Sequence, residues 1–303
     1  MMILLLLFFS FLLYVVVGPA GVHAPLDILM YRAMRGFYAV IAGGALSLSG
    51  VMLQALFSNP LVEPYLLGVS SGATTGSLLA IFFLGVVSPL FISGFSFSIA
   101  LLMVILLFAL SRRFFPSREA LLLVGISAGS TLTAINSIIM LIKSKNPSSD
   151  LLFWLLGSLS GIGEREVLIS LVLIPGFIYT LFLHRELDLL LWGEESEFMG
   201  LELRKIQGIV LVLATAFAAV VVSLSGIIGF VGLISPHITR RIYGWSHKRL
   251  LPYSIAVGGL VLLASDFLAR NLLSPTEIPV GLITSLIGAP LFLYLVMKKE
   301  RFQ

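Results

Sequence analysis

Side chains that could perform covalent chemistry are few in this sequence, and they form no catalytic pattern that we can assign. The histidines are His23, His184, His237 and His247, which do not cluster at metal-ligand spacing, and cysteine is absent. The phosphate-binding pattern Gly-x-x-x-x-Gly-Lys-Ser/Thr and the zinc pattern His-Glu-x-x-His do not occur. We therefore expect no catalytic residue, no metal site and no cofactor bound by this chain.

Two oppositely charged residues are spaced for pairing inside an apolar region. Asp266 and Arg270 lie four residues apart near the end of a hydrophobic run. Ionisable groups at that depth in a membrane are costly unless they are paired or hydrated. They predict a local ion pair or, alternatively, an outward-facing Arg270 that Asp266 orients toward a partner. Arg32 and Arg35 are expected at the same outer surface.

Small residues gather in the stretch 43–73, which is interrupted by Asn-Pro and Glu-Pro. Glycine and serine let helices approach closely, and prolines stop regular helix. The stretch predicts two closely packed helices beside a pathway, with a rigid connection between them. Its candidate pathway or packing residues are Gly43, Ser47, Gly50, Gln54, Asn59, Pro60, Gly68, Ser71 and Gly72.

A charged loop at 184–205 carries apolar side chains that a solvated loop would not need. We interpret Leu191–Leu201 as a glycine-punctuated amphipathic helix, with three glutamates opposite its apolar side. Apolar groups in such a loop favour docking to a partner. The candidate docking residues are Leu191, Trp192, Gly193, Glu194, Glu195, Phe198, Met199, Gly200 and Leu201.

The composition indicates the kind of protein that must position these residues. The chain of 303 residues is 58% hydrophobic and 11% charged, whereas soluble domains carry about 25% charged residues. We predict an all-α polytopic membrane protein, formed by one domain over 1–303. About ten transmembrane helices are expected, at 1–18, 36–57, 65–86, 91–110, 120–142, 167–183, 206–224, 227–242, 250–269 and 279–297.

The distribution of Lys and Arg predicts the orientation. With the N-terminus inside, 13 basic residues lie on the cytoplasmic side and 6 on the outer side. This bias favours cytoplasmic termini. Residues 150–162 are too short to cross and are predicted to form an interfacial or re-entrant helix, with Trp154 at the membrane boundary.

An internal repeat is predicted from two similar stretches. Ser47–Gly50 followed by Asn59-Pro60 is echoed by Ser223–Gly226 followed by Ser235-Pro236. The stretches lie five spans apart, so the two copies would have opposite orientations. This predicts an inverted repeat of spans 2–5 and 7–10, of the kind that places a pathway at its interface.

Several motifs in order give a resemblance to a known family. They are Gly43–Ala73, Trp154–Ser158, Gly226–His237, Asp266–Arg270, Glu277–Gly281 and Gly288–Phe292. Over about 30–298 the sequence resembles the FecCD family, the membrane subunits of type II ABC importers for cobalamin, haem and iron–siderophore complexes. The pattern is most similar to that of cobalamin permeases.

The resemblance implies partners and roles. The permease would be a homodimer in a prokaryotic cell membrane, in contact with lipid and with no nucleic acid. Two ATPase subunits, which bind ATP and Mg²⁺, would dock on Leu191–Leu201, and an extracytoplasmic binding protein would meet Arg32, Arg35 and Arg270. Arg118 and Glu119 would lie at a cytoplasmic gate, although this chain departs from the cobalamin permeases there.

Other functions stay open on the residues alone. A secondary transporter would also fit an inverted repeat, but no intramembrane carboxylate relay is evident. An intramembrane enzyme is disfavoured because no acid, base or nucleophile pair is evident. Within the importer interpretation, the cargo could be a metal chelate or an oxyanion such as molybdate.

Overall fold

The computed structural model describes residues 2–19, 21, 24–85, 88–114, 118–143 and 155–299, and these contain helices and loops but no strand. The all-α prediction is therefore confirmed for this part of the chain. The elements are α1 (Met2–Val16), α2 (Leu26–Leu56), the 3₁₀ turn η1 (Pro64–Leu67), α3 (Val69–Phe82), α4 (Pro89–Phe114), α5 (Arg118–Lys143), α7 (Glu164–Ser170), α8 (Leu173–Phe182), α9 (His184–Leu190), α10 (Glu195–Phe198), α11 (Leu203–Ser225), α12 (Val231–Tyr243), α13 (His247–Asn271) and α14 (Val280–Lys299).

Each predicted span overlaps at least one of these helices, but their lengths differ. By length and composition, six helical segments among the described residues could cross a membrane: Leu26–Leu56, Leu90–Ala109, Glu119–Ile142, Glu164–Phe182, Leu203–Ser225 and His247–Asn271. The shorter apolar helices include α1, α3 and much of α14. The chain is thus multi-pass, while the total of ten spans stays a prediction.

Two predicted boundaries were wrong, and each has a local cause. Helix α2 begins at Leu26, ten residues before the predicted start at 36, directly after Pro25. The predicted span 65–86 is broken at Gly68, whose φ of 76° lies in the left-handed region that favours glycine. The predicted span 167–183 overlaps the segment Glu164–Phe182, which is long enough to cross and consists of α7 and α8. The two helices separate shortly before Pro175, which cannot donate a backbone hydrogen bond.

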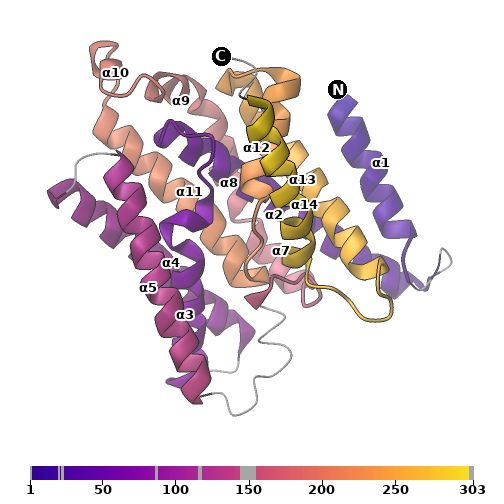
Figure 1. Cartoon of the computed structure of the whole chain (residues 1–303). Helices are drawn as coiled ribbons and strands as arrows, with labels where there is room; N and C mark the ends of the chain where they lie inside the picture. Colours follow the sequence, from indigo (N-terminus) through magenta and orange to yellow (C-terminus); the bar gives the residue numbers. More distant parts are fainter. Residues whose placement is uncertain are drawn as a thin grey trace.

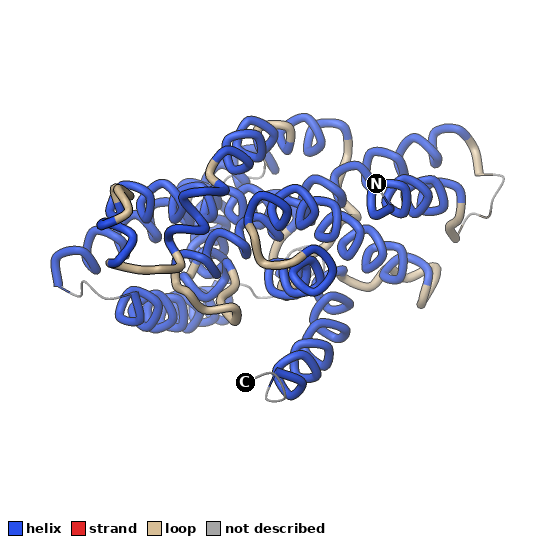
Figure 2. Tube along the Cα trace, turned by 90° about the horizontal axis from the view of Figure 1, so that it is seen from above, coloured by secondary structure: helices blue, strands red, loops and turns tan. Residues whose placement is uncertain are grey.

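Helix α2 is the buried centre of the fold, and α11, α12 and α13 pack around it (Figure 1). Seen from above, the described residues form helices and loops throughout (Figure 2). The packing depends on glycines that allow backbones to touch. A Cβ atom at Gly43 would overlap the carbonyl oxygen of Gly258, and one at Gly50 would overlap that of Gly232. The small-residue stretch therefore joins α2 to α13 and α12 with no room for side chains.

The two stretches of the predicted repeat have different local structures. Ser47–Gly50 lies inside α2, whereas Ser223–Gly226 ends α11 at Gly226, which has a φ of 73°. Asn59-Pro60 lies in a loop, but Pro236 lies inside α12. These four-residue matches are therefore not structurally equivalent, and the inverted repeat stays a prediction.

The predicted interfacial helix at 150–162 is described only from residue 155, and Trp154 lies outside the described residues. Residues 157–163 form a loop, so a helix there was a wrong prediction. This loop is fixed by its backbone: Ser158 N donates to Ser225 O at 2.9 Å, and Gly281 N donates to Gly157 O at 3.1 Å. It joins the end of α11 to the start of α14.

Candidate translocation cavity and partner surfaces

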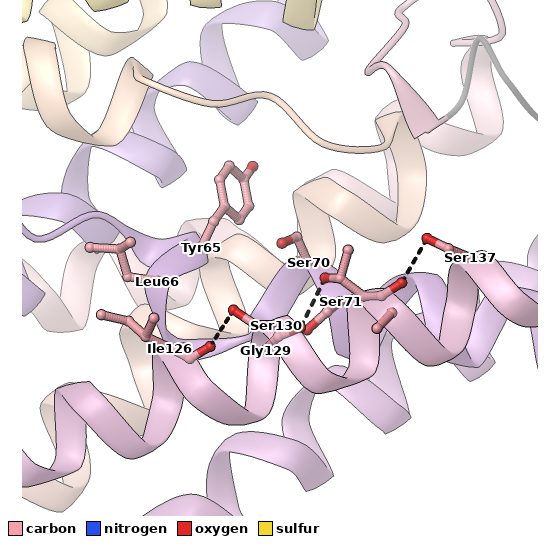
Figure 3. A pocket seen from close by; sticks show the side chains of 10 residues that line it. Tyr65, Leu66, Ser70, Ser71, Ile126, Gly129, Ser130 and Ser137 are labelled. Atoms are coloured by element: carbon pink, nitrogen blue, oxygen red, sulfur yellow. Dashed lines mark hydrogen bonds between the residues drawn. The ribbon is translucent and has the colours of Figure 1, made fainter.

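A cavity of about 460 Å³ lies between α5 and the break that joins η1 to α3 (Figure 3). Serine and threonine side chains form much of its wall. The lining residues are Tyr65, Leu66, Ser70, Ser71, Ile126, Gly129, Ser130, Thr133, Ala134 and Ser137. Such a surface can pass or hold a polar solute through hydroxyl oxygens, without a fixed charge or a metal ligand.

The hydroxyl groups of α5 are held by their own helix. Ser130 donates to Ile126 O at 2.9 Å, Thr133 to Gly129 O at 2.8 Å, and Ser137 to Thr133 O at 2.9 Å. Each hydroxyl therefore keeps acceptor lone pairs for water or a solute. All three residues are exposed in the isolated chain.

Asn136 fixes α5 against α3 beside this cavity. Its amide nitrogen donates to Ser71 O at 3.0 Å, and its amide oxygen accepts from the Thr75 hydroxyl at 2.9 Å. Gly68 and Gly129 also meet closely, since a Cβ at Gly129 would lie 3.1 Å from the Gly68 Cα. The cavity wall is thus positioned by one buried amide and one glycine contact.

The predicted pathway residues separate into three groups. Gly43, Ser47, Gly50 and Gln54 are buried in the α2 core, away from the large cavity. Gly68, Ser71 and Gly72 belong to the start of α3, where Ser71 lines the cavity and Gly72 faces α4. Asn59 accepts a hydrogen bond from Leu61 N at 2.9 Å and so fixes the turn at Pro60.

Sequence reasoning did not identify the hydroxyl groups of α5 as cavity-lining groups, although a spacing of small residues pointed to this region. Gly68-Val-Ser70-Ser-Gly72 and Gly125-Ile-Ser127-Ala-Gly129 both have the Gly-x-Ser-x-Gly spacing of a serine nucleophile. That motif requires a preceding strand, and both stretches instead lie at or within helices. The spacing here brings small residues of α3 and α5 together.

Glu63 connects the loop after α2 to the start of α12. Its carboxylate accepts a hydrogen bond from Phe230 N at 3.2 Å. Burial raises the pKa of Glu63, and this backbone hydrogen bond acts in the opposite direction. The loop between the two prolines is therefore a fixed connection.

The three arginines that we predicted on the outer side are buried within this chain. Arg35 places its guanidinium between two carboxylates: Nη2 lies 2.8 Å from Asp266, and Nη1 lies 2.9 Å from Glu277. Tyr14 also donates to Asp266, at 2.5 Å. Asp266 thus binds Arg35 across 231 residues, which differs from the local pair with Arg270 that the spacing predicted.

Arg32 and Arg270 hold the end of α1. Arg32 Nη1 donates to Val16 O at 3.2 Å, and Arg270 Nη2 donates to Val17 O at 2.9 Å and to Tyr14 O. Cations satisfy the free carbonyls at a helix C-terminus. Arg270, expected to face outward, is only 4% exposed.

The prediction that Leu191–Leu201 forms one amphipathic helix was wrong. It contains the single turn α10, between Gly193 and Gly200, whose φ angles are 64° and 86°. Phe198 is 93% exposed, Trp192 and Met199 are also exposed, and Leu201 is buried. Glu194 and Glu195 are exposed as well, so the segment has both apolar and acidic groups that are accessible.

The predicted gate residues lie at the start of α5. Glu119 is exposed in its first turn, and the side chain of Arg118 lies outside the described residues. The large cavity begins farther along the helix, at Ile126.

Comparisons with known proteins decide the class of this multi-helix protein. The model of the FecCD transport family matches residues 3–298. The chain belongs to this family. It is similar to the cobalamin import permease BtuC of Halobacterium salinarum, with 38% identity over 89% of this chain and 73% of the relative. It is also similar to the molybdate import permease MolB of Haemophilus influenzae, with 38% identity over 90% of this chain and 82% of the relative.

A solved structure shares the whole fold. It is described as an inward-facing conformation of a metal-chelate type ABC transporter, and it matches with a TM-score of 0.90 and 33% identity. The match covers 98% of this chain and 97% of the other. The FecCD chain is therefore a membrane permease of the ABC importer class, a transport subunit and not itself an enzyme.

Proposed function

We propose that this permease forms its pathway as a homodimer, with α5 of each copy facing the axis. The observation that carries the proposal is the hydroxyl-lined cavity on α5, a helix that is mostly exposed in the isolated chain. A single chain leaves this polar wall open, whereas polar groups within a membrane are expected to face protein or water. A second copy would close the wall around a central passage.

The proposed orientation in a prokaryotic cell membrane has both termini in the cytoplasm. Figure 1 shows both chain ends and the α9–α10 region toward the same side of the molecule. Arg32 and Arg270 bind the opposite end of α1, at Tyr14–Val17. This arrangement agrees with the basic-residue bias and supports an even number of spans.

The proposed cargo is a metal chelate, such as cobalamin, haem or an iron–siderophore. The match to a metal-chelate type transporter over nearly the whole chain supports this class. An oxyanion such as molybdate is the second candidate, because the molybdate permease MolB and the cobalamin permease BtuC share the same identity with this chain, 38%. A wall of neutral hydroxyls is compatible with either cargo.

The energy would come from two separate ATPase subunits that carry ATP and Mg²⁺, and a binding protein would deliver the cargo. Uptake coupled to protons or sodium without an ATPase would contradict this proposal. Docking of the binding protein through Arg32, Arg35 and Arg270 also remains a proposal. It requires these buried guanidinium groups to exchange carbonyl or carboxylate partners of their own chain for those of the binding protein.

Replacing Thr133 with phenylalanine should block the passage. The bulky ring would project from the cavity wall, and we expect cargo uptake to fall by about tenfold or more, since a channel filled by a side chain loses its polar surface. Uptake into proteoliposomes measures the effect. Thr131→Phe is the matched control, because Thr131 is exposed on the same helix but does not line the cavity. Equal transport by both variants, at equal dimer content, would refute the assignment.

Replacing Phe198 with glutamate should uncouple ATP hydrolysis from uptake. Phe198 is 93% exposed, so its loss should leave the melting temperature of the permease unchanged. An apolar anchor at an interface core contributes about 2 kcal/mol or more, so affinity for the ATPase subunit should fall by about thirtyfold. Phe198→Leu should retain most of the affinity and serves as the control. Normal coupling in the glutamate variant would remove this segment from the interface.

A further inference from the structure

A second, smaller cavity lies at the end of α2, beside the proposed ATPase-docking segment. Its volume is about 100 Å³. Four parts of the chain meet there: the end of α2, the following turn, the end of α9 and the connection from α12 to α13. The lining residues are Gln54, Ala55, Ser58, Asn59, Pro60, Leu191, Arg240, Trp245 and His247.

Two polar groups on this wall are left without a hydrogen bond. The amide oxygen of Gln54 and the Nη1 nitrogen of Arg240 are buried and have no hydrogen-bond partner among the described residues. Gln54 is only 2% exposed, and its amide nitrogen is already engaged with Val62 O at 3.3 Å. Buried polar groups in folded proteins nearly always have partners. Both residues line the cavity, so a small side-chain movement would present one acceptor and one charged donor to an occupant.

The nearby carboxylate of Asp188 pairs with His247 and not with Arg240. Asp188 is bound by His247, through Nδ1 at 2.6 Å and the backbone nitrogen at 3.1 Å. In the part of the chain that the structure describes, no carboxylate forms an ion pair with Arg240. Its Cζ lies 5.4 Å from the centre of the Trp245 ring. Stacking on an aromatic face leaves the edge of a guanidinium free for an acceptor in its plane.

The charge of this region favours an anionic occupant. The segment 240–249 contains Arg240, Arg241, Lys248 and Arg249 and no acidic residue. Guanidinium groups bind carboxylates and phosphates through paired hydrogen bonds. A cavity of about 100 Å³ can admit one carboxylate group together with one water, whose share of liquid volume is about 30 Å³.

The position of the cavity identifies the source of the carboxylate. Leu191, which begins the docking segment, also lines the cavity, and Trp245 beside it is 66% exposed. The cavity therefore opens on the surface where we place the ATPase subunit. We propose that it receives an aspartate or glutamate side chain of that subunit, which pairs with Arg240. The inference rests on the proposed function. It adds a contact at Arg240, in the last turn of α12, to the proposed contact of the ATPase subunit with Phe198.

Replacing Arg240 with glutamine tests the pairing. Loss of a desolvated charge pair should weaken binding of the ATPase subunit by at least about tenfold. Arg241→Gln is the matched control, because Arg241 is the neighbouring, exposed cation. It should change the affinity by less than about threefold, and raising the salt should remove that effect because exposed charges are screened. Binding is measured with the permease in nanodiscs and the purified ATPase subunit.

A second measurement does not depend on Arg240 and keeps the inference testable if its variant misfolds. Because the chain has no cysteine, Trp245→Cys introduces a unique thiol on the exposed rim. Added ATPase subunit should slow its reaction with a maleimide by about tenfold, as expected for a site covered at an interface.

The contrary outcomes are distinct. Unchanged affinity in Arg240→Gln and unchanged labelling at residue 245 would overturn the proposed pairing. A loss of co-purified anionic phospholipid in Arg240→Gln, with normal ATPase binding, would instead assign the cavity to a lipid phosphate. Failure of Phe198→Glu to weaken binding would refute the docking surface itself, which separates that result from failure of the Arg240 contact.

Discussion

Asp266→Asn is expected to destabilise the permease by about 3 kcal/mol, the lower end of what breaking a buried pair costs, because the buried Arg35 guanidinium keeps only the partly exposed Glu277 as a charged partner. Asp266 is fully buried and binds Arg35 through two hydrogen bonds of 2.8 and 2.9 Å. Asparagine has nearly the same size, so the effect would come from charge and not from a cavity. Thermal unfolding of the detergent-solubilised chain measures the loss.

Glu277→Gln provides the control for this prediction. It removes the other carboxylate of Arg35, but the Glu277 side chain is 37% exposed. Water can compensate a partly exposed pair, so a loss of about 1 kcal/mol or less is expected. Equal destabilisation by both variants would show that burial does not determine how much each ion pair contributes to the free energy of unfolding. A stable Asp266→Asn protein would contradict the assigned network.

Gly50→Ala is expected to destabilise the fold by about 3 kcal/mol or more, at the upper end of what overpacking costs. The added methyl group would overlap the carbonyl oxygen of Gly232, which belongs to the backbone and cannot move by a rotamer change. Helices α2 and α12 would have to separate. The fraction of protein recovered as a monodisperse peak, followed by thermal unfolding, measures the effect.

Gly94→Ala is the matched control, since Gly94 also lies in a helix but has open space where the methyl group would go. Among the described residues, no atom of a neighbouring element lies within 4 Å of that position. Alanine is preferred over glycine in helices by about 1 kcal/mol, so this variant should be as stable as the parent or slightly more stable. Similar losses in both variants would show that helix propensity, and not the contact with α12, controls position 50.

The hydrophobic composition and the order of motifs were enough to predict the fold class and the family. Apolar runs mark membrane helices because the hydrocarbon core requires them, whatever their neighbours are. The break at Gly226 was also predictable, since glycine permits the positive φ of 73° found there. Such features depend on local sequence, and a single chain displays them directly.

The roles of the arginines depended on contacts that are remote in sequence. The spacing of Asp266 and Arg270 suggested a local pair, but Arg35, 231 residues away, takes the carboxylate. Arg270 instead binds the end of α1, because that terminus brings unpaired carbonyl groups to it. A helical spacing of four residues permits an ion pair, and tertiary packing decides whether a different cation binds the carboxylate instead.

The distinction between packing and pathway also required the tertiary structure. Gly50 and Gly68 belong to the same small-residue stretch, yet Gly50 contacts α12 in the core and Gly68 contacts α5 beside the large cavity. Glycine is required in both places because two backbones meet closely. The sequence by itself was enough to identify a membrane permease of the FecCD family. The tertiary structure decided which small and charged residues face a cavity, because that depends on which distant helix lies opposite each of them.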